Sequence, residues 1–267
     1  MLIDVHAHFY TERSGRADWQ ATNTARLDAG HKIGITSHVA SILGTWGMYS
    51  PTYFPSPEDI THANDRMIEL AQVHRDVLGY CVVNPNYTEH ALTEIKLRLK
   101  QGMIGVKLAA SRRANDELLD PIATLAGENG VPILHHVWHH RRHEWPGQEA
   151  SDATELAGLA ERHLATDFIM AHLGGGGDWS HSLRAVREVP NVWVDLSGSG
   201  VDVAMLEAAL NEIGPDRLLW GADITLGTAW AKLRYLESVG IAETDLDLIR
   251  FGNAFRLFPE GVFHDDN

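Results

Sequence analysis

The sequence opens with Leu2-Ile3-Asp4-Val5-His6-Ala7-His8, the stretch that decides the fold. Polar and apolar residues alternate in it, which predicts a β-strand with Asp4, His6 and His8 on one face. Two imidazoles two residues apart on a strand face can hold a divalent metal ion; alternatively, both are satisfied by hydrogen bonds. Polar ligands at the carboxyl end of a first strand suit a barrel whose active site lies at the strand ends. This interpretation predicts further ligands at the ends of later strands.

Size and composition indicate an ordinary globular chain. With 267 residues, 44% of them hydrophobic, we expect a single domain over residues 1–267. A net charge of −14 argues against nucleic acid as a partner, since phosphates are bound by Lys and Arg. We expect no membrane span, because no run of about 18 apolar residues occurs. The start resembles no secretory leader and Cys81 is the only cysteine, so we expect a reducing cytoplasm. A homo-oligomer is left open.

Short β-like runs alternate with amphipathic helical stretches along the whole chain, which is the pattern of βα units around a parallel sheet. The expected strands lie near residues 2–6, 35–41, 77–83, 103–108, 131–136, 167–172, 191–197 and 217–222. The expected helices lie near residues 22–32, 57–74, 88–101, 115–129, 152–163, 178–188, 203–213, 229–239 and 245–251. Eight strands are what a (β/α)8 TIM barrel needs.

Later strands do end in metal-ligand residue types. Strand five ends in His135-His136, and parity alone does not say which of the two faces inward. Strand six ends in His172, and strand eight ends in Asp223. Four strands that end in this way favour a metal site over isolated histidines.

Three imidazoles and one carboxylate make a catalytic type of metal site. His6, His8, a strand-five histidine and Asp223 would leave a coordination position open for water, and Zn²⁺ is the expected ion. Asp223 can also take a proton, as a ligand that doubles as a base. His172 is either a further ligand or an imidazole that polarises the substrate and shuttles protons, and we favour the second.

Five motifs together resemble the amidohydrolase-related family, the branch of the amidohydrolase superfamily that includes aminocarboxymuconate semialdehyde decarboxylase and related hydrolases and decarboxylases. The motifs are Asp4-Val5-His6-Ala7-His8, Pro132-Ile133-Leu134-His135-His136, Ala171-His172-Leu173-Gly174-Gly175, Trp220-Gly221-Ala222-Asp223 and Gly252-Asn253-Ala254-Phe255-Arg256-Leu257-Phe258. The resemblance runs from residue 2 to about 258. It implies a (β/α)8 barrel, and it makes His6, His8, His136 and Asp223 the metal ligands. It also implies that His172 contacts the metal-bound water or the substrate.

Lys107 on the fourth strand is expected to point inward. Three interpretations stay open: it pairs with Asp4 or with a substrate carboxylate, it is carboxylated and bridges two metal ions as in binuclear relatives, or it reaches solvent. The site therefore holds one ion, or two if Lys107 is carboxylated.

Long connections after the strands are expected to shape the substrate pocket. Residues 9–21, 43–55 and 138–148 carry the candidates Trp46, Trp138 and Arg141. Gly174 to Gly177 either cradle a phosphate or carboxylate at a helix N-terminus or, as we favour, make a tight turn close to the substrate. Ser197 is a candidate polar contact.

We predict a metal-dependent hydrolase that acts with activated water on an amide, ester or lactone of a small molecule. The first alternative is a non-oxidative decarboxylase of a small aromatic or unsaturated acid, with Lys107 or Arg141 holding a carboxylate. The second alternative is a metal-binding or ligand-binding barrel without catalysis.

Overall fold

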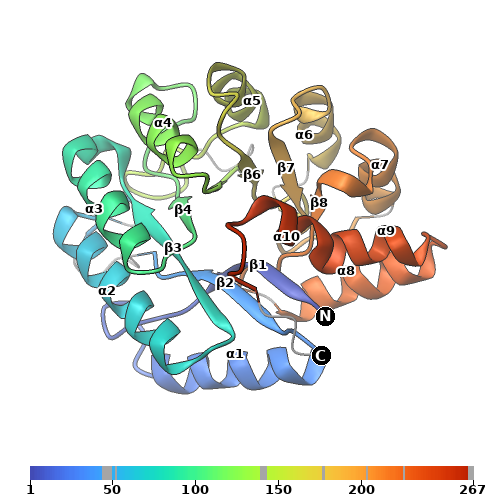
Figure 1. Ribbon diagram of the computed structural model, residues 1–267, viewed down its shortest axis with the longest axis horizontal. Helices are drawn as coiled ribbons and strands as arrows, with labels where there is room; N and C mark the ends of the chain where they lie inside the picture. Colours follow the sequence, from blue (N-terminus) through green and yellow to red (C-terminus); the bar gives the residue numbers. More distant parts are fainter. Residues whose placement is uncertain are drawn as a thin grey trace.

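The computed structural model describes residues 1–43, 50–51, 53–138, 143–175, 178–202, 204–224 and 226–263, and within them eight parallel strands form one sheet in chain order (Figure 1). The strands are β1 (Ile3–His8), β2 (Ser37–Ser41), β3 (Val77–Val83), β4 (Gly105–Leu108), β5 (Ile133–His135), β6 (Phe168–Met170), β7 (Val192–Asp195) and β8 (Leu218–Leu219). A parallel bridge between Ala7 and Asp223, and a bond from the Val5 N–H to the Trp220 carbonyl, join the last strand to the first. The predicted (β/α)8 barrel is confirmed.

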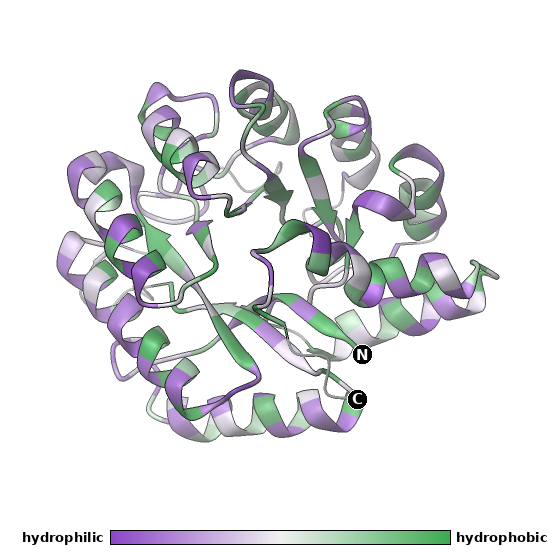
Figure 2. Cartoon of the chain, in the orientation of Figure 1, coloured by the Kyte–Doolittle hydropathy of each residue, from purple (hydrophilic) through white to green (hydrophobic). Residues whose placement is uncertain are grey.

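Helices surround this sheet. They are α1 (Trp19–Ile33), α2 (Pro57–Val73), α3 (Thr88–Lys100), α4 (Asp120–Glu128), α5 (Ala153–Arg162), α6 (Trp179–Val186), α7 (Met205–Glu212), α8 (Leu226–Ser238), α9 (Glu243–Asp247) and α10 (Asn253–Leu257). Hydrophobic and hydrophilic residues are interspersed along the helices, as Figure 2 shows. In α5 the buried residues Leu156, Ala157, Leu159 and Ala160 form an apolar face.

Local sequence explains where several helices begin. The Ser56 hydroxyl accepts the Asp59 N–H ahead of α2, and Pro57 occupies the first helical position. Asp152 forms a capping box with Glu155 at the start of α5. The predicted helix at 245–251 is instead α9 followed by a π-helical turn over Leu248–Gly252, so its backbone pairing differs from the expected regular helix.

The barrel interior is filled by side chains of several strands. Its cluster consists of Ile3, Val5, Val39, Tyr80, Ile104, Leu134, Ile169, Ala171, Trp193, Leu219, Ala254, Leu257, Phe258 and Phe263. Tyr80 donates its hydroxyl across this interior to the Val5 carbonyl. Because Phe258 and Phe263 pack with Ile3 and Ile104 near the beginnings of strands, the C-terminal segment closes that end and leaves the opposite end for the site.

The predicted common face of Asp4, His6 and His8 is wrong. The register of β1 against β2 slips by one residue between Asp4 and Ala7, so the side-chain alternation changes phase there. Asp4 lies on the helix side, where its carboxylate accepts a bond from the buried Arg26 of α1 at 2.9 Å. After the slip, His6 and His8 turn into the barrel mouth.

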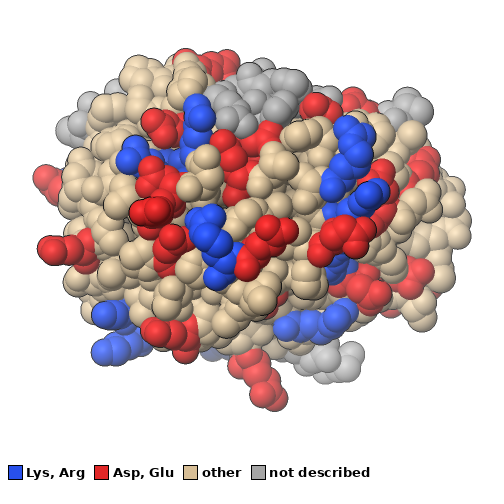
Figure 3. All heavy atoms as spheres, turned by 90° about the horizontal axis from the view of Figure 1, so that it is seen from above, with Lys and Arg blue, Asp and Glu red and all other residues tan. Residues whose placement is uncertain are grey.

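Charge on the face drawn in Figure 3 is mixed, since Lys and Arg are interspersed with Asp and Glu over the described residues. Within the described residues, no helix is both long and apolar enough to cross a membrane.

Candidate active site

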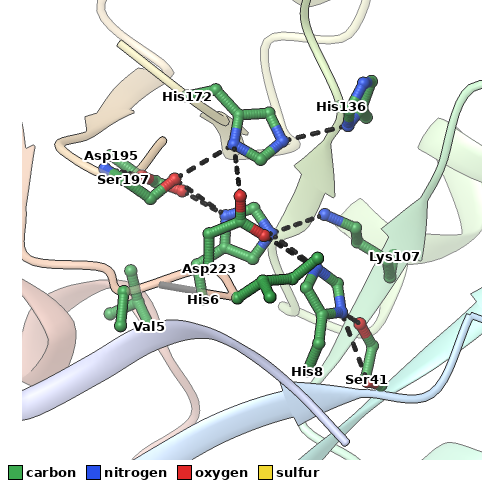
Figure 4. A network of polar contacts seen from close by, with 12 residues as sticks. Val5, His6, His8, Ser41, Lys107, His136, His172, Asp195, Ser197 and Asp223 are labelled. Carbon is green, nitrogen blue, oxygen red and sulfur yellow. Dashed lines mark hydrogen bonds and ion pairs between the residues drawn. The ribbon is translucent and has the colours of Figure 1, made fainter. Parts of the chain in front are cut away.

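The two histidines of β1 are held by their Nδ1 atoms. Asp195, the last residue of β7, lies with Oδ2 2.6 Å from His6 Nδ1. His8 Nδ1 lies 3.0 Å from the hydroxyl of Ser41 and 3.3 Å from its carbonyl oxygen. Both Nε2 atoms then face the same point and are 3.1 Å apart (Figure 4). A carboxylate or carbonyl on one ring nitrogen frees the other for a metal ion.

Asp223 follows β8 and reaches this point from the other side. Its carboxylate lies 3.4 Å from His8 Nε2 and 3.9 Å from His6 Nε2. Burial alone would raise its pKa, but the neighbouring His172 and His8 hold the pKa of the Asp223 carboxyl well below its usual range. Its φ of 55° is left-handed, and its N–H donates to the His6 carbonyl at 2.6 Å. Asp223 is therefore an ionised carboxylate fixed to the histidine strand.

His172 connects Asp223 to His136. Its Nδ1 is 3.5 Å from Asp223 Oδ2, and its Nε2 is 2.9 Å from His136 Nδ1. Like Asp223, His172 has left-handed backbone, with a φ of 68°. Within the described part of the chain, the buried His136 Nε2 has no hydrogen-bond partner. His135 bonds elsewhere, with Nδ1 3.0 Å from the His136 carbonyl and Nε2 3.4 Å from Ser151 Oγ.

Lys107 projects from β4 into the same cluster. Only 1% of its surface is exposed, and its Nζ lies 2.9 Å from His6 Nε2. Burial lowers the pKa of this ammonium to about 8. The bond expected with Asp4 is replaced by this contact with His6, because Asp4 lies outside the barrel.

The donor set fits a divalent cation. Burial lowers the pKa of His6, His8 and His136, and lowers that of His172 to about 3, so these imidazoles are neutral, the form that ligates metals. Ligand atoms of His6, His172 and Asp223 lie within 4.8 Å of one another. Facing imidazole nitrogens, an ionised carboxylate and an unpartnered buried nitrogen are what a metal ion would satisfy.

The geometry brings the predicted ligands together to different degrees. His6, His8 and Asp223 converge directly. His136 joins through His172, and among the described residues His172 is the imidazole that groups with His6 and Asp223. Either His136 or His172 can therefore be the further metal ligand beside His6, His8 and Asp223.

A cavity of about 250 Å³ opens onto this cluster. The described residues that line it are His8, Leu43, Tyr53, Lys107, Ala109, His136, Trp138, His172, Ser199, Asp223 and Ile224. The Trp138 ring stands 5.5 Å from that of His136 and 5.8 Å from that of His172, while Tyr53 is 5.8 Å from His136. The other two substrate-contact candidates, Trp46 and Arg141, lie outside the described residues.

Sequence reasoning missed Asp195. The carboxylate is fully buried and ends the apolar run Val192-Trp193-Val194, which is the same signal that singled out Asp223. Ser197, two residues further on, has Oγ 3.2 Å from Nδ1 of both His6 and His172. These two residues hold the rings of the imidazole cluster.

An eight-stranded parallel barrel with such a cluster at the carboxyl ends of its strands is the TIM-barrel architecture, whose active sites lie at that end. The chain belongs to the amidohydrolase family, whose model matches residues 3–259, and is an enzyme of the amidohydrolase superfamily. No curated protein sequence matches the chain.

Solved structures share the fold. The 2,6-dihydroxybenzoate decarboxylase from Rhizobium has a TM-score of 0.72 and 17% identity, over 96% of this chain and 98% of the other. A dihydroxybenzoic acid decarboxylase from Polaromonas, with bound manganese and the inhibitor 2-nitroresorcinol, has a TM-score of 0.72 and 18% sequence identity, over 96% of each chain. The 4-oxalomesaconate hydratase from Rhodopseudomonas palustris has a TM-score of 0.71 and 17% sequence identity, over 97% of this chain and 96% of the other.

Proposed function

We propose that this protein is a metal-dependent non-oxidative decarboxylase of a small ring carboxylic acid. The observation that carries the proposal is the position of Lys107, a buried cation that lines the cavity beside His6. A carboxylate entering the cavity would give this cation a partner of opposite charge, and buried charges need such partners. Two similar structures are named as decarboxylases of dihydroxybenzoates, which supports the same class of substrate.

The cavity walls suit a planar ring. Tyr53 and Trp138 stand close to the imidazole cluster, and Leu43 and Ala109 add apolar surface. A cavity of about 250 Å³ is large enough for one substituted ring. Arg141 and Trp46 stay predictions as further substrate contacts.

The metal would be held by His6, His8 and Asp223, with His136 as the predicted fourth ligand and His172 as the alternative. When bound, one divalent ion would supply Lewis-acid polarisation of a substrate oxygen. Manganese in a similar structure makes Mn²⁺ as suitable a candidate as Zn²⁺. Two ions per chain would instead favour a carboxylated Lys107.

His172 and Asp223 would relay the proton that the reaction consumes. In decarboxylation the bond between the ring carbon and the carboxyl carbon breaks, its electron pair stays on the ring carbon, and one proton taken up from solvent replaces CO₂ there. His172 Nδ1 and Asp223 Oδ2, 3.5 Å apart, line the cavity where that proton must be passed.

Hydrolysis of an amide, ester or lactone, which the sequence alone favoured, is the second candidate. The low pKa of Asp223 supports it, because an ionised carboxylate is the form that accepts a proton from attacking water. A barrel that binds a metal without catalysis is the third.

A substrate panel separates these functions. Protein loaded with Mn²⁺ or Zn²⁺ is given hydroxybenzoates, with release of CO₂ recorded, and lactones and esters in parallel. We expect CO₂ release from an acid and its loss in Lys107→Met. Turnover of lactones with all acids inert would replace the proposal with hydrolysis, and inactivity on every class would favour the binding barrel.

A further inference from the structure

Lys232 is a second fully buried lysine, on α8 and outside the cavity just described. None of its surface is exposed, and its Nζ donates to the carbonyl oxygens of Ser197 at 3.0 Å and Gly198 at 2.5 Å. Among the described residues, no carboxylate lies within ion-pair distance of it. An ammonium buried against carbonyl groups alone is costly, and burial lowers its pKa to about 8. We therefore infer that Lys232 is buried here for a role other than packing.

Two glycine-containing loops make room for the end of this side chain. A Cβ on Gly174, after β6, would collide with Lys232 Nζ. Gly198, after β7, has a φ of +93°, and a Cβ there would approach the Gly175 nitrogen to 2.5 Å. The Gly174 N–H donates to the Ser197 carbonyl at 3.0 Å, so this oxygen accepts from both the loop and the lysine. Lys232 therefore holds the loop after β7 at the same Ser197 oxygen to which the loop after β6 is bonded.

The tied residue contacts two imidazoles. Ser197 Oγ stands 3.2 Å from His6 Nδ1 and 3.2 Å from His172 Nδ1, as Figure 4 shows. The Ser197 N–H donates to Asp195, the carboxylate that also contacts His6 Nδ1. A shift of the Ser197 backbone would therefore move the partners of both rings at once.

We propose that Lys232 is a positioning residue for the metal centre: its bonds to the Ser197 and Gly198 carbonyls fix the Ser197 hydroxyl against His6 and His172. The inference rests on the proposed metal-dependent function. It adds a residue remote from the substrate, on a helix that no ligand motif touches. Loss of groups that orient metal-ligating histidines typically lowers metal affinity about 10- to 100-fold.

The test is Mn²⁺ affinity, measured by competition with a chelator on the full-length protein without substrate. We expect Lys232→Met and Ser197→Ala each to weaken binding about 10-fold or more. The double variant should bind no more weakly than the weaker single variant, because both act through the same hydroxyl. Lys232→Gln, whose amide can donate to the same carbonyls, should recover most of the affinity. Arg234→Met, an exposed cation on the same helix, is the control.

The outcomes are distinguishable. If the wild-type protein takes up no metal, both the proposed function and this inference fail. If it binds Mn²⁺ and Lys232→Met binds equally tightly, only the positioning role is overturned. Additive losses in the double variant would also contradict it, since Lys232 would then act independently of Ser197. Should Lys232→Met not fold, Ser197→Ala and Lys232→Gln decide: unchanged affinity in Ser197→Ala overturns the proposal.

Discussion

Asp223 and His172 face each other across the barrel mouth, with Oδ2 and Nδ1 3.5 Å apart, and both residues hold left-handed backbone at φ values of 55° and 68°. Non-glycine residues adopt this conformation at a cost, and such strain tends to collect at functional sites. Arg26 helps to hold Asp223, since it donates to the Asp223 carbonyl at 2.6 Å. His172 and Asp223, which we assign to proton transfer, are two of the four described non-glycine residues with positive φ; the others are Tyr53 and Ala204.

Asp223→Asn should remove activity without unfolding the barrel. Asn tolerates left-handed backbone, so the conformation at φ 55° is kept while the charge is lost. We expect turnover to fall by at least about 100-fold, the scale of a lost general acid or base. Steady-state rates and a melting curve check this. A variant with unchanged turnover and normal melting would remove Asp223 from the mechanism.

Asp195→Asn should weaken metal binding. The Asp195 carboxylate stands 2.6 Å from His6 Nδ1 and orients the ring whose other nitrogen faces the site. The expected loss of Mn²⁺ affinity is about 10- to 100-fold. Asp167→Asn is the matched control, because Asp167 bonds Trp193 Nε1 rather than a ligand. Equal affinities of the two variants would contradict the role of Asp195.

Lys107→Met should stabilise the metal-free protein while it abolishes decarboxylation. Burial lowers the pKa of Lys107 to about 8, so keeping it charged at pH 7 costs stability. This lowering of the pKa from the ordinary lysine value corresponds to a loss of up to about 3 kcal/mol in the free energy of unfolding. An apolar side chain at this position would recover it. Denaturant unfolding in chelator measures it. A loss of stability would show that Lys107 is held by favourable partners.

Features set by residues close together in the sequence could be predicted, whereas features set by contacts between distant segments could not. Helix α2 at Pro57–Val73 followed from local residues, since Ser56 caps it and Pro57 begins it. The strand order followed from alternation of patterns along the chain. The face of Asp4 did not, because the slip in β1 is set by pairing with β2, which the β1 sequence does not reveal.

The site divides in the same way. His6, His8 and Asp223 were predicted because each ends a strand, and parallel strands in a barrel end at one mouth. The partnership of Asp195 with His6 joins β7 to β1, 189 residues apart, so only the closed barrel reveals it. Whether His136 or His172 completes the metal site depends on the loops that turn these rings, which no local pattern encodes.

The metal-free protein should lose stability in mild acid. Burial lowers the pKa of His135 in the folded state to about 4, whereas an unfolded histidine titrates near its ordinary value. The unfolded chain thus binds the proton first, so stability is complete above that ordinary value and falls as the pH drops towards 4. At pH 5, this residue alone accounts for about 2 kcal/mol. Denaturant midpoints of wild-type protein and His135→Gln between pH 7 and pH 5 should differ in slope; parallel curves would contradict it.

We predict that His6, His8 and Asp223 together hold a divalent ion. The most direct measurement is anomalous diffraction at the manganese edge from crystals grown with Mn²⁺. We predict one peak between the Nε2 atoms of His6 and His8 and the Asp223 carboxylate, with His136 or His172 as a further ligand. No peak at these residues, in crystals whose protein is folded and fully exposed to Mn²⁺, would contradict the account.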